Sequence, residues 1–282
     1  MNKLVLLGVV VVAACQADNR NLEKKVDDLS KKLDQVLARG GGPGAAAPAQ
    51  RAARAEPDRA KTYAVPIDGD PVDGPADAKV TLVKAYDYAC PYCEKVRDTM
   101  DDLRKKYGTD LRIVFKQLVV HPQIATAGAL AVCAANKQGK FLQMDQLLWD
   151  KGFKGRQFDK DAAEGGGQKC WETPAGCSVV LGFAQELGLN ADKFKADMKG
   201  ECQALIQKDM RELQALGVGS TPTFFVNGRY LVGAMPIDNF VAIIDEELKK
   251  ANEKIQAGTP AASFYQQVVL DKGLKALERP AQ

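Results

Sequence analysis

The stretch Val80–Cys93 reads VTLVKAYDYACPYC and decides the fold class of this chain. Its first half is rich in β-branched and aromatic side chains, which predicts a strand. Cys90 and Cys93 follow directly, at a spacing that places them about one turn apart on a helix. The sequence therefore predicts a strand that ends at a pair of cysteines.

The residues after the cysteine pair continue the pattern. Glu94–Tyr107 carries apolar residues at helical intervals and is followed by Gly108, a typical helix stop. Leu111–Leu118 is again typical of a strand. Strand, helix and strand in this order start a βαβ unit and predict an α/β fold.

A second group of elements lies far downstream. Gln203–Leu216 has a helical pattern that ends at Gly217. Ser220–Gly228 predicts a turn, a strand and a hairpin turn, and Arg229–Val232 is the partner strand. Ile237–Lys250 is expected to be a final amphipathic helix.

The Cys-Pro-Tyr-Cys motif at residues 90–93, paired with Gly217–Phe224, resembles the DsbA-like branch of the thioredoxin superfamily. The resemblance covers about Lys79–Glu247. It implies a thioredoxin fold, a central mixed β-sheet flanked by helices, with a helical insertion at about residues 122–200. It also implies thiol–disulfide oxidoreductase activity without a cofactor.

The chemistry of the motif follows from its place at a helix start. The attacking group in disulfide exchange is a thiolate. Cys90 is expected at the N-cap, where the helix dipole lowers a thiol pKa. Pro91 suits the first helical position, because its missing N–H has no partner there anyway. Pro91 and Tyr92 separate the two cysteines. Attack of Cys90 on a substrate would form a mixed disulfide between Cys90 and the substrate, and Cys93 would then resolve it.

The resemblance assigns roles to two further residues. In similar proteins the proline that matches Pro222 is cis and faces the cysteines. Thr221, just before it, is expected to pair with the substrate backbone, with its hydroxyl near the sulfur atoms. An ordinary turn before a strand is the alternative for both residues.

Lys84 departs from the family pattern. Similar proteins often carry a buried acid six residues before the first cysteine, and that position here is Lys84. A charged Lys84 would stabilise thiolates, whereas a side chain that snorkels to water would have no such role. Asp87 is a candidate substitute for the acid. His121 is expected to be a turn or capping residue before the insertion.

Four more cysteines lie in the predicted insertion and the helix after it: Cys133, Cys170, Cys177 and Cys202. Four cysteines allow three pairings, and the sequence does not choose among them. The short loop favours Cys170 with Cys177, which would leave Cys133 with Cys202. A redox relay and a metal site are the alternatives to structural disulfides.

The N-terminus predicts export. A positive start and the apolar run Leu4–Val12 are typical of a signal peptide, and the run is too short to span a bilayer. Small residues directly before Cys15 resemble the bacterial lipobox, which implies cleavage after residue 14 and a lipid on Cys15. Gln16 weakly favours the outer membrane. An ordinary signal peptide with a chance cysteine is the alternative.

The chain between Cys15 and the catalytic domain is expected to contain a short helix and a linker. Apolar residues at 22, 26, 29, 33 and 36 form a coiled-coil seam of little more than two heptads, which predicts a homo-oligomer through residues 22–36. A helix lying on its own domain or on lipid is the alternative. Residues 15–39 thus form the anchor and helix and 40–60 a flexible linker. A catalytic domain at 61–257 and a helical tail at 258–282 follow.

These features together favour a periplasmic oxidoreductase that acts on exported cysteine-containing proteins and a membrane redox partner. The motif lacks the histidine of strongly oxidising DsbA proteins, and Thr221 resembles the oligomeric DsbC and ScsC types. Isomerase or reductase activity is therefore preferred, with a DsbA-type oxidase as the alternative. A thiol-based copper- or zinc-binding lipoprotein is a third hypothesis. A net charge of +3 gives no signature for nucleic acid.

Overall fold

The computed structural model describes residues 24–32, 34–35, 56–163 and 169–277. The chain divides into two compact units, residues 1–54 and 55–282. In the first unit the described residues are helical and exposed. The expectations for the signal segment, for Cys15 and for most of the linker lie outside the described residues. None of the described helices is long and apolar enough to cross a membrane.

The second unit is built on one five-stranded mixed sheet in the order β1-β3-β2-β4-β5. Strands β2 and β3 are parallel, and the other neighbouring strands are antiparallel. This is the arrangement expected from a βαβ unit followed by a hairpin. The strands are β1 (Val72–Asp73), β2 (Val80–Tyr86), β3 (Leu111–Gln117), β4 (Thr223–Val226) and β5 (Arg229–Val232).

Strand β2 lies at the centre of the sheet, and all seven of its residues are buried. Its side chains alternate between two hydrophobic clusters, with Leu82 and Tyr86 on one face and Val83 and Ala85 on the other. Because helices cover both faces, the strand reads as a nearly continuous apolar run.

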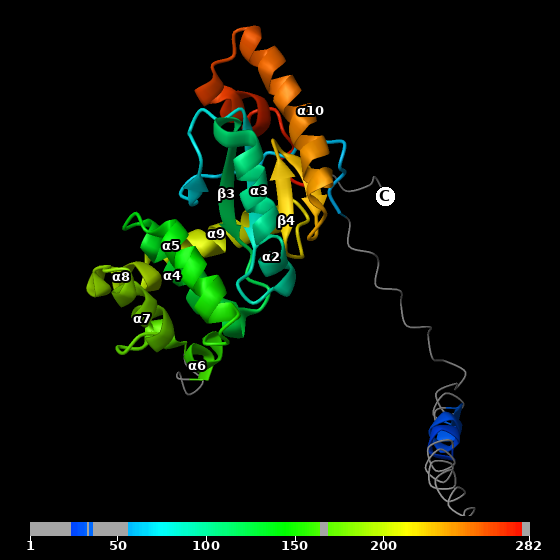
Figure 1. The fold of residues 1–282 in the computed structure, drawn as a ribbon, viewed down its shortest axis with the longest axis vertical. Coiled ribbons are helices and arrows are strands. Elements are labelled where there is room, and N and C mark those ends of the chain that lie inside the picture. Colours follow the sequence, from blue (N-terminus) through cyan, green and yellow to red (C-terminus); the bar gives the residue numbers. More distant parts are fainter. Residues whose placement is uncertain (1–23, 33, 36–55, 164–168, 278–282) are drawn as a thin grey trace, which may run out of the picture. The chain divides into compact units, whose positions relative to one another are not determined.

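Helices α3 (Arg97–Tyr107) and α10 (Ile237–Gln256) cover the first face, and α9 (Glu201–Ala215) covers the second (Figure 1). The single helix expected after the cysteines is divided at Val96, so that a short α2 (Pro91–Lys95) precedes α3. Val96 has a ψ of −2°, whereas a regular α-helix has about −42°.

The helical insertion fills the interval between β3 and α9 and forms its own group of helices (Figure 1). Its core joins the first hydrophobic cluster of the sheet. It consists of α4 (Pro122–Asn136), α5 (Phe141–Leu147), η2 (Leu148–Phe153), α6 (Phe158–Ala163), η3 (Cys170–Glu172), α7 (Ser178–Glu186) and α8 (Ala191–Lys199).

The segment after α10 packs on the second face of the sheet. It contains η4 (Ala261–Ser263) and η5 (Tyr265–Leu270), and Tyr265 is buried in the second cluster. The tail was expected to be helical, but after η5 the described chain turns, and Leu274 forms a bridge with Tyr63. Backbone pairing with the segment around Tyr63, at the start of the second unit, therefore replaces the helix that was expected after η5.

Candidate active site

Cys90 and Cys93 are the free cysteines of the described chain, and they lie just beyond the end of the central strand. Cys90 has extended backbone angles and is the N-cap of α2, and Pro91 occupies the first helical turn. The side chain of Cys90 is 5% exposed, whereas Cys93 is fully buried. Only the first sulfur is therefore placed to meet a substrate.

The loop before β4 lies against Cys90. The Thr221–Pro222 peptide bond is cis. The Sγ atom of Cys90 lies 3.3 Å from the carbonyl oxygen of Thr221, within reach of a thiol hydrogen bond. Strand β4 pairs with β2, which brings this loop to the end of the strand that leads to the cysteines. The fold thus joins two motifs that are 131 residues apart.

The environment lowers the pKa of the Cys90 thiol from 9.0 to about 5. The largest cause is a hydrogen bond from the Cys93 side chain, and partial burial opposes it. A hydrogen bond from the side chain of Thr221 and those from the backbone N–H groups of Tyr92 and Cys93 lower the pKa further. Cys90 is consequently a thiolate at neutral pH, which is the reactive form.

Cys93 has the opposite environment. Burial raises the pKa of its thiol far above the ordinary value, and the neighbouring Cys90 raises it further. Lys84 is the side chain whose charge acts against this rise. The pair therefore consists of an ionised thiol on Cys90 and a protonated, buried thiol on Cys93.

Replacing Cys93 by alanine is expected to raise the pKa of Cys90 by about one pH unit or more, because the main donor to the thiolate is lost. Cys93→Ser, which retains a hydroxyl donor, should leave the pKa closer to about 5. The near-ultraviolet absorbance of the thiolate, followed against pH, measures both values. Identical titrations of the two variants would contradict this account of the low pKa.

Asp87 is fully buried between the cysteine turn and the loop before α4. Its carboxylate accepts hydrogen bonds from the backbone N–H groups of Ala89 (2.6 Å), Val120 (2.6 Å) and His121 (2.8 Å). The Nδ1 atom of His121 lies 3.3 Å from the same carboxylate, and His121 is the N-cap residue of α4. Through these contacts Asp87 links the cysteine turn to the loop before α4.

Lys84 lies on β2 and is 2% exposed, so the alternative in which its side chain reaches water is wrong. Its Nζ atom lies 5.1 Å from the ring centre of Tyr86 and 5.7 Å from that of Phe115. Burial lowers the pKa of Lys84, while the charges of Asp145 and Cys93 act to raise it. Lys84 therefore interacts electrostatically with the buried sulfur.

Asp145, on α5 of the insertion, is a residue of this site that the sequence analysis missed. Its Oδ1 atom accepts hydrogen bonds from the Tyr88 hydroxyl (2.6 Å) and the Trp149 indole (3.2 Å). The Tyr88 hydroxyl also lies 3.1 Å from that of Tyr86. Burial raises the pKa of Asp145, and Lys84 opposes the rise. A helix distant in sequence thus contributes a carboxylate whose charge acts on Lys84, the lysine that in turn acts on Cys93.

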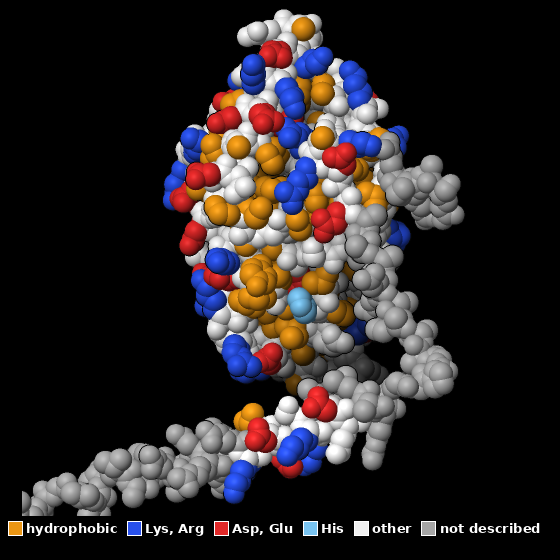
Figure 2. All heavy atoms as spheres, turned by 90° about the vertical axis from the view of Figure 1, so that its right-hand side faces the viewer, with side chains coloured by type: hydrophobic (Ala, Val, Ile, Leu, Met, Phe, Trp, Pro, Cys, Tyr) orange, Lys and Arg blue, Asp and Glu red, His pale blue; other side chains and the backbone are white. Residues whose placement is uncertain are grey.

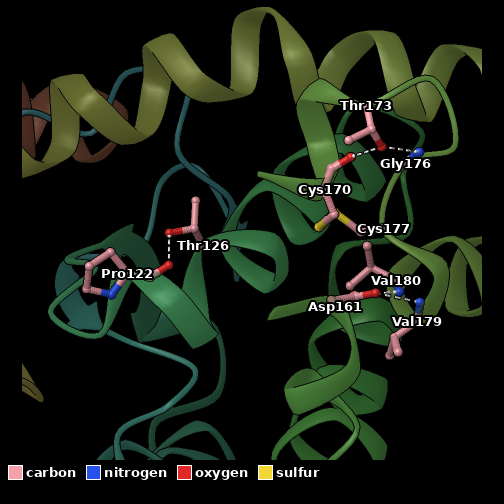
Figure 3. The surroundings of a disulfide bond; sticks show 9 residues. All are labelled: Pro122, Thr126, Asp161, Cys170, Thr173, Gly176, Cys177, Val179 and Val180. Atoms are coloured by element: carbon pink, nitrogen blue, oxygen red, sulfur yellow. Dashed lines mark hydrogen bonds between the residues drawn. A yellow bond between two sulfur atoms is a disulfide. The ribbon is translucent and has the colours of Figure 1, made fainter. Parts of the chain in front are cut away.

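The other four described cysteines form two disulfides, Cys133–Cys202 and Cys170–Cys177. The first joins α4 to α9. The second closes a seven-residue interval before α7, where the Thr173 hydroxyl donates to the Cys170 carbonyl and accepts from the Gly176 N–H (Figure 3). They therefore fix the insertion and leave Cys90 and Cys93 free.

The surface around the motif is apolar. Tyr92 is 61% exposed, and Val120 and Ile124 are each 38% exposed. Figure 2 shows hydrophobic side chains gathered beside the pale-blue histidine, which is His121, the single histidine of the sequence. Such a surface suits contact with apolar segments of another chain.

Several solved structures share this fold. BdbD from Bacillus subtilis superposes with a TM-score of 0.56 at 22% identity, over 69% of this chain and 100% of that one. The catalytic domain of Proteus mirabilis ScsC superposes with a TM-score of 0.51 at 22% identity, over 66% of this chain and 93% of that one. Wolbachia pipientis alpha-DsbA1 superposes with a TM-score of 0.53 at 16% identity, over 68% of this chain and 96% of that one. At these identities the similarity shows the fold.

Curated relatives also match this chain. The Na(+)/H(+) antiporter NhaA of Herminiimonas arsenicoxydans is 32% identical over 183 residues, which is 64% of this chain and 26% of that protein. NhaA 1 of Salinispora arenicola is 33% identical over 188 residues, 64% and 25% of the two chains. This chain spans about a quarter of the length of these relatives. A thioredoxin family model matches residues 67–246, more than half of the sequence, and the chain belongs to that thioredoxin family.

Proposed function

We propose that the protein is a periplasmic thiol–disulfide oxidoreductase that exchanges disulfides with exported proteins, mainly as an isomerase or reductase. One observation carries the proposal. The sulfur of Cys90 lies at a helix N-terminus, where the pKa of its thiol falls to about 5, and 3.3 Å from the carbonyl oxygen of Thr221, while its partner Cys93 is buried. The two structural disulfides favour an oxidising compartment outside the cytosol.

The proposed reaction begins when the Cys90 thiolate attacks a substrate disulfide. A mixed disulfide forms, and one substrate thiolate leaves. Cys93 then loses its proton and attacks the sulfur of Cys90, which releases the second substrate thiolate and leaves a Cys90–Cys93 disulfide. Two electrons pass to the substrate in this reductase direction. In isomerisation another substrate thiolate resolves the mixed disulfide, and the pair ends reduced.

The N-terminal helix supports the isomerase form of the proposal. Val26 and Leu29, two positions of the predicted coiled-coil seam, are 58% and 67% exposed. We propose that further copies of the chain cover this seam, and that a lipid on Cys15 holds them on a membrane. Tethering raises the local concentration and helps a short coiled coil to form. A membrane redox partner would return the pair to its reduced state.

An oxidase of the DsbA type is the second candidate. The low pKa of Cys90 stabilises the reduced protein, and stabilisation of the reduced form is what makes DsbA a strong oxidant. Metal binding is the third candidate. Of the described cysteines only Cys90 and Cys93 keep free thiols, and the described residues contain no group of three or more metal-ligating side chains.

The reduction potential and the molar mass decide between these functions. The lipid-free chain, residues 16–282, is expected to be an oligomer with a potential near −180 mV, about that of protein disulfide isomerase. A monomer near −120 mV would identify an oxidase, and a monomer near −270 mV a thioredoxin-like reductant, each by its approximate family value. Light scattering on the variant with Val26→Lys and Leu29→Lys provides the matched monomer control.

A further inference from the structure

The buried thiol of Cys93 needs a path for its proton. Resolution of the mixed disulfide requires the thiolate of Cys93, but this side chain is fully buried and burial raises its pKa. Asp87, the carboxylate nearest in sequence, already accepts three backbone hydrogen bonds. These bonds occupy most of the acceptor positions of the Asp87 carboxylate, so a second carboxylate is the better candidate for the proton acceptor.

A pocket of about 320 Å³ lies on the side of β2 that faces α3 and α5. Lys84 and Asp145 are among its lining residues, and Leu142, which also lines it, is 46% exposed. The pocket is polar and large enough for several water molecules. Its volume leaves room for water between the buried Lys84 and the exposed Leu142.

Asp145 has the chemistry of a proton acceptor in this pocket. The side chain is half-buried, and its two hydrogen bonds, from Tyr88 and Trp149, both end on Oδ1. Among the described residues none donates a hydrogen bond to Oδ2. Burial raises the pKa of this carboxyl, while burial lowers the pKa of Lys84. A carboxylate whose proton affinity is raised is a better proton acceptor than an ordinary exposed one.

We propose that Asp145 accepts the Cys93 proton through water in this pocket, and that the Lys84 ammonium stabilises the Cys93 thiolate while the proton is away. The inference rests on the proposed function. The S–H bond of Cys93 breaks, its proton reaches the Asp145 carboxylate, and its electron pair forms the S–S bond with Cys90. The leaving substrate thiolate takes a proton from solvent, and Asp145 returns its own proton to solvent through the pocket.

This arrangement explains how a chain with Lys84 in place of a buried acid can still resolve a mixed disulfide. The carboxylate comes from the helical insertion, so the insertion supplies part of the redox chemistry. Other titratable groups act on Lys84 or Asp145 or line their pocket: Tyr86 at the end of β2, Tyr88 just after it, and Arg97, Asp101 and Arg104 on α3. Asp101 lines the same pocket from the opposite helix, and half of its side chain is exposed.

The test compares Asp145→Asn with Asp101→Asn, because the two remove one carboxylate each from the same pocket. Asparagine keeps an oxygen that accepts the Tyr88 and Trp149 hydrogen bonds. The measurement is the rate at which a Cys90–glutathione mixed disulfide closes to the Cys90–Cys93 disulfide, followed by rapid acid quenching and mass spectrometry between pH 5 and pH 9.

Asp145→Asn is expected to slow closure by about ten- to a hundredfold at pH 7, with the deficit shrinking toward pH 9 as hydroxide replaces the lost base. Asp145→Glu should restore the rate, and Asp101→Asn should behave like the wild type. Lys84→Met should shift the pH profile of closure to higher pH, because the positive charge that lowers the pKa of Cys93 is lost.

Two outcomes would overturn the relay. Asp145→Asn could close at the wild-type rate at every pH, or it could be slower by one constant factor that Asp145→Glu does not restore. The second result would mean that Asp145 acts only by packing. Failure of the proposed function looks different, since the wild-type protein itself would then not form or close the mixed disulfide.

Discussion

Cys90→Ser is expected to reduce the rate of disulfide exchange by more than about a thousandfold. The reaction begins with a thiolate, and the environment holds the pKa of Cys90 at about 5, so almost every molecule is reactive at pH 7. A serine hydroxyl at the same position stays protonated and cannot attack a disulfide. Reduction of insulin by dithiothreitol with catalytic amounts of the protein measures the loss.

Two matched variants separate this chemistry from folding. Cys93→Ser should still attack substrate but should accumulate the mixed disulfide on Cys90, because the resolving thiol is gone. The double variant Cys170→Ser and Cys177→Ser removes a structural disulfide away from the motif and should retain exchange activity. Full exchange activity of Cys90→Ser would contradict the proposed oxidoreductase function.

Local patterns were sufficient for the central part of the fold. The run Val80–Tyr86 was predicted as a strand from its β-branched and aromatic residues, and it is the buried centre of the sheet. The hairpin between β4 and β5 was predicted from Asn227 and Gly228, which have φ angles of 45° and 84°. A two-residue turn of this kind needs positive φ at both positions, and these residue types tolerate it best.

Side-chain positions in the site could not be predicted in the same way. Whether Lys84 snorkels or stays buried depends on helices that cover it, and these belong to the insertion and to α3. Asp145 carries no local signal, since its approach to Lys84 results from the packing of α5 on the sheet. The sequence suggested Asp87 as a replacement acid, but three backbone groups from two loops occupy its carboxylate.

Lys116→Met is expected to destabilise the protein by about 3–5 kcal/mol, the typical result of removing one partner from a buried ion pair. The ammonium group of Lys116 is fully buried and lies 2.7 Å from Asp70, 2.7 Å from Asp209 and 3.0 Å from Glu212. Asp209 also accepts a hydrogen bond from the backbone of Gln117. Methionine preserves the volume but leaves Asp70 and Asp209 without their cation, while Glu212 keeps Lys208 at 3.8 Å.

The pH dependence of this loss has a definite sign. Burial and the neighbouring Asp209 raise the pKa of Asp70 from 3.8 to about 8. The folded protein therefore holds a proton between these values that the unfolded chain has released, so this group's contribution to stability falls as the pH rises from about 4 to about 8. Without Lys116 the carboxyl groups bind protons more tightly. The destabilisation should thus be smaller at pH 5 than at pH 8.

Urea unfolding of the wild type and the variant at both pH values, with the disulfides intact, measures the effect. Lys151→Met is the matched control, because Lys151 pairs with Glu186 at 2.7 Å but both side chains are almost half exposed. Exposed pairs of this kind contribute about 1 kcal/mol or less. If both variants lose the same free energy of unfolding, water must reach the Lys116 cluster. A large and pH-dependent loss in Lys116→Met alone would mean that this cluster holds α9, and with it the end of the insertion, against the sheet.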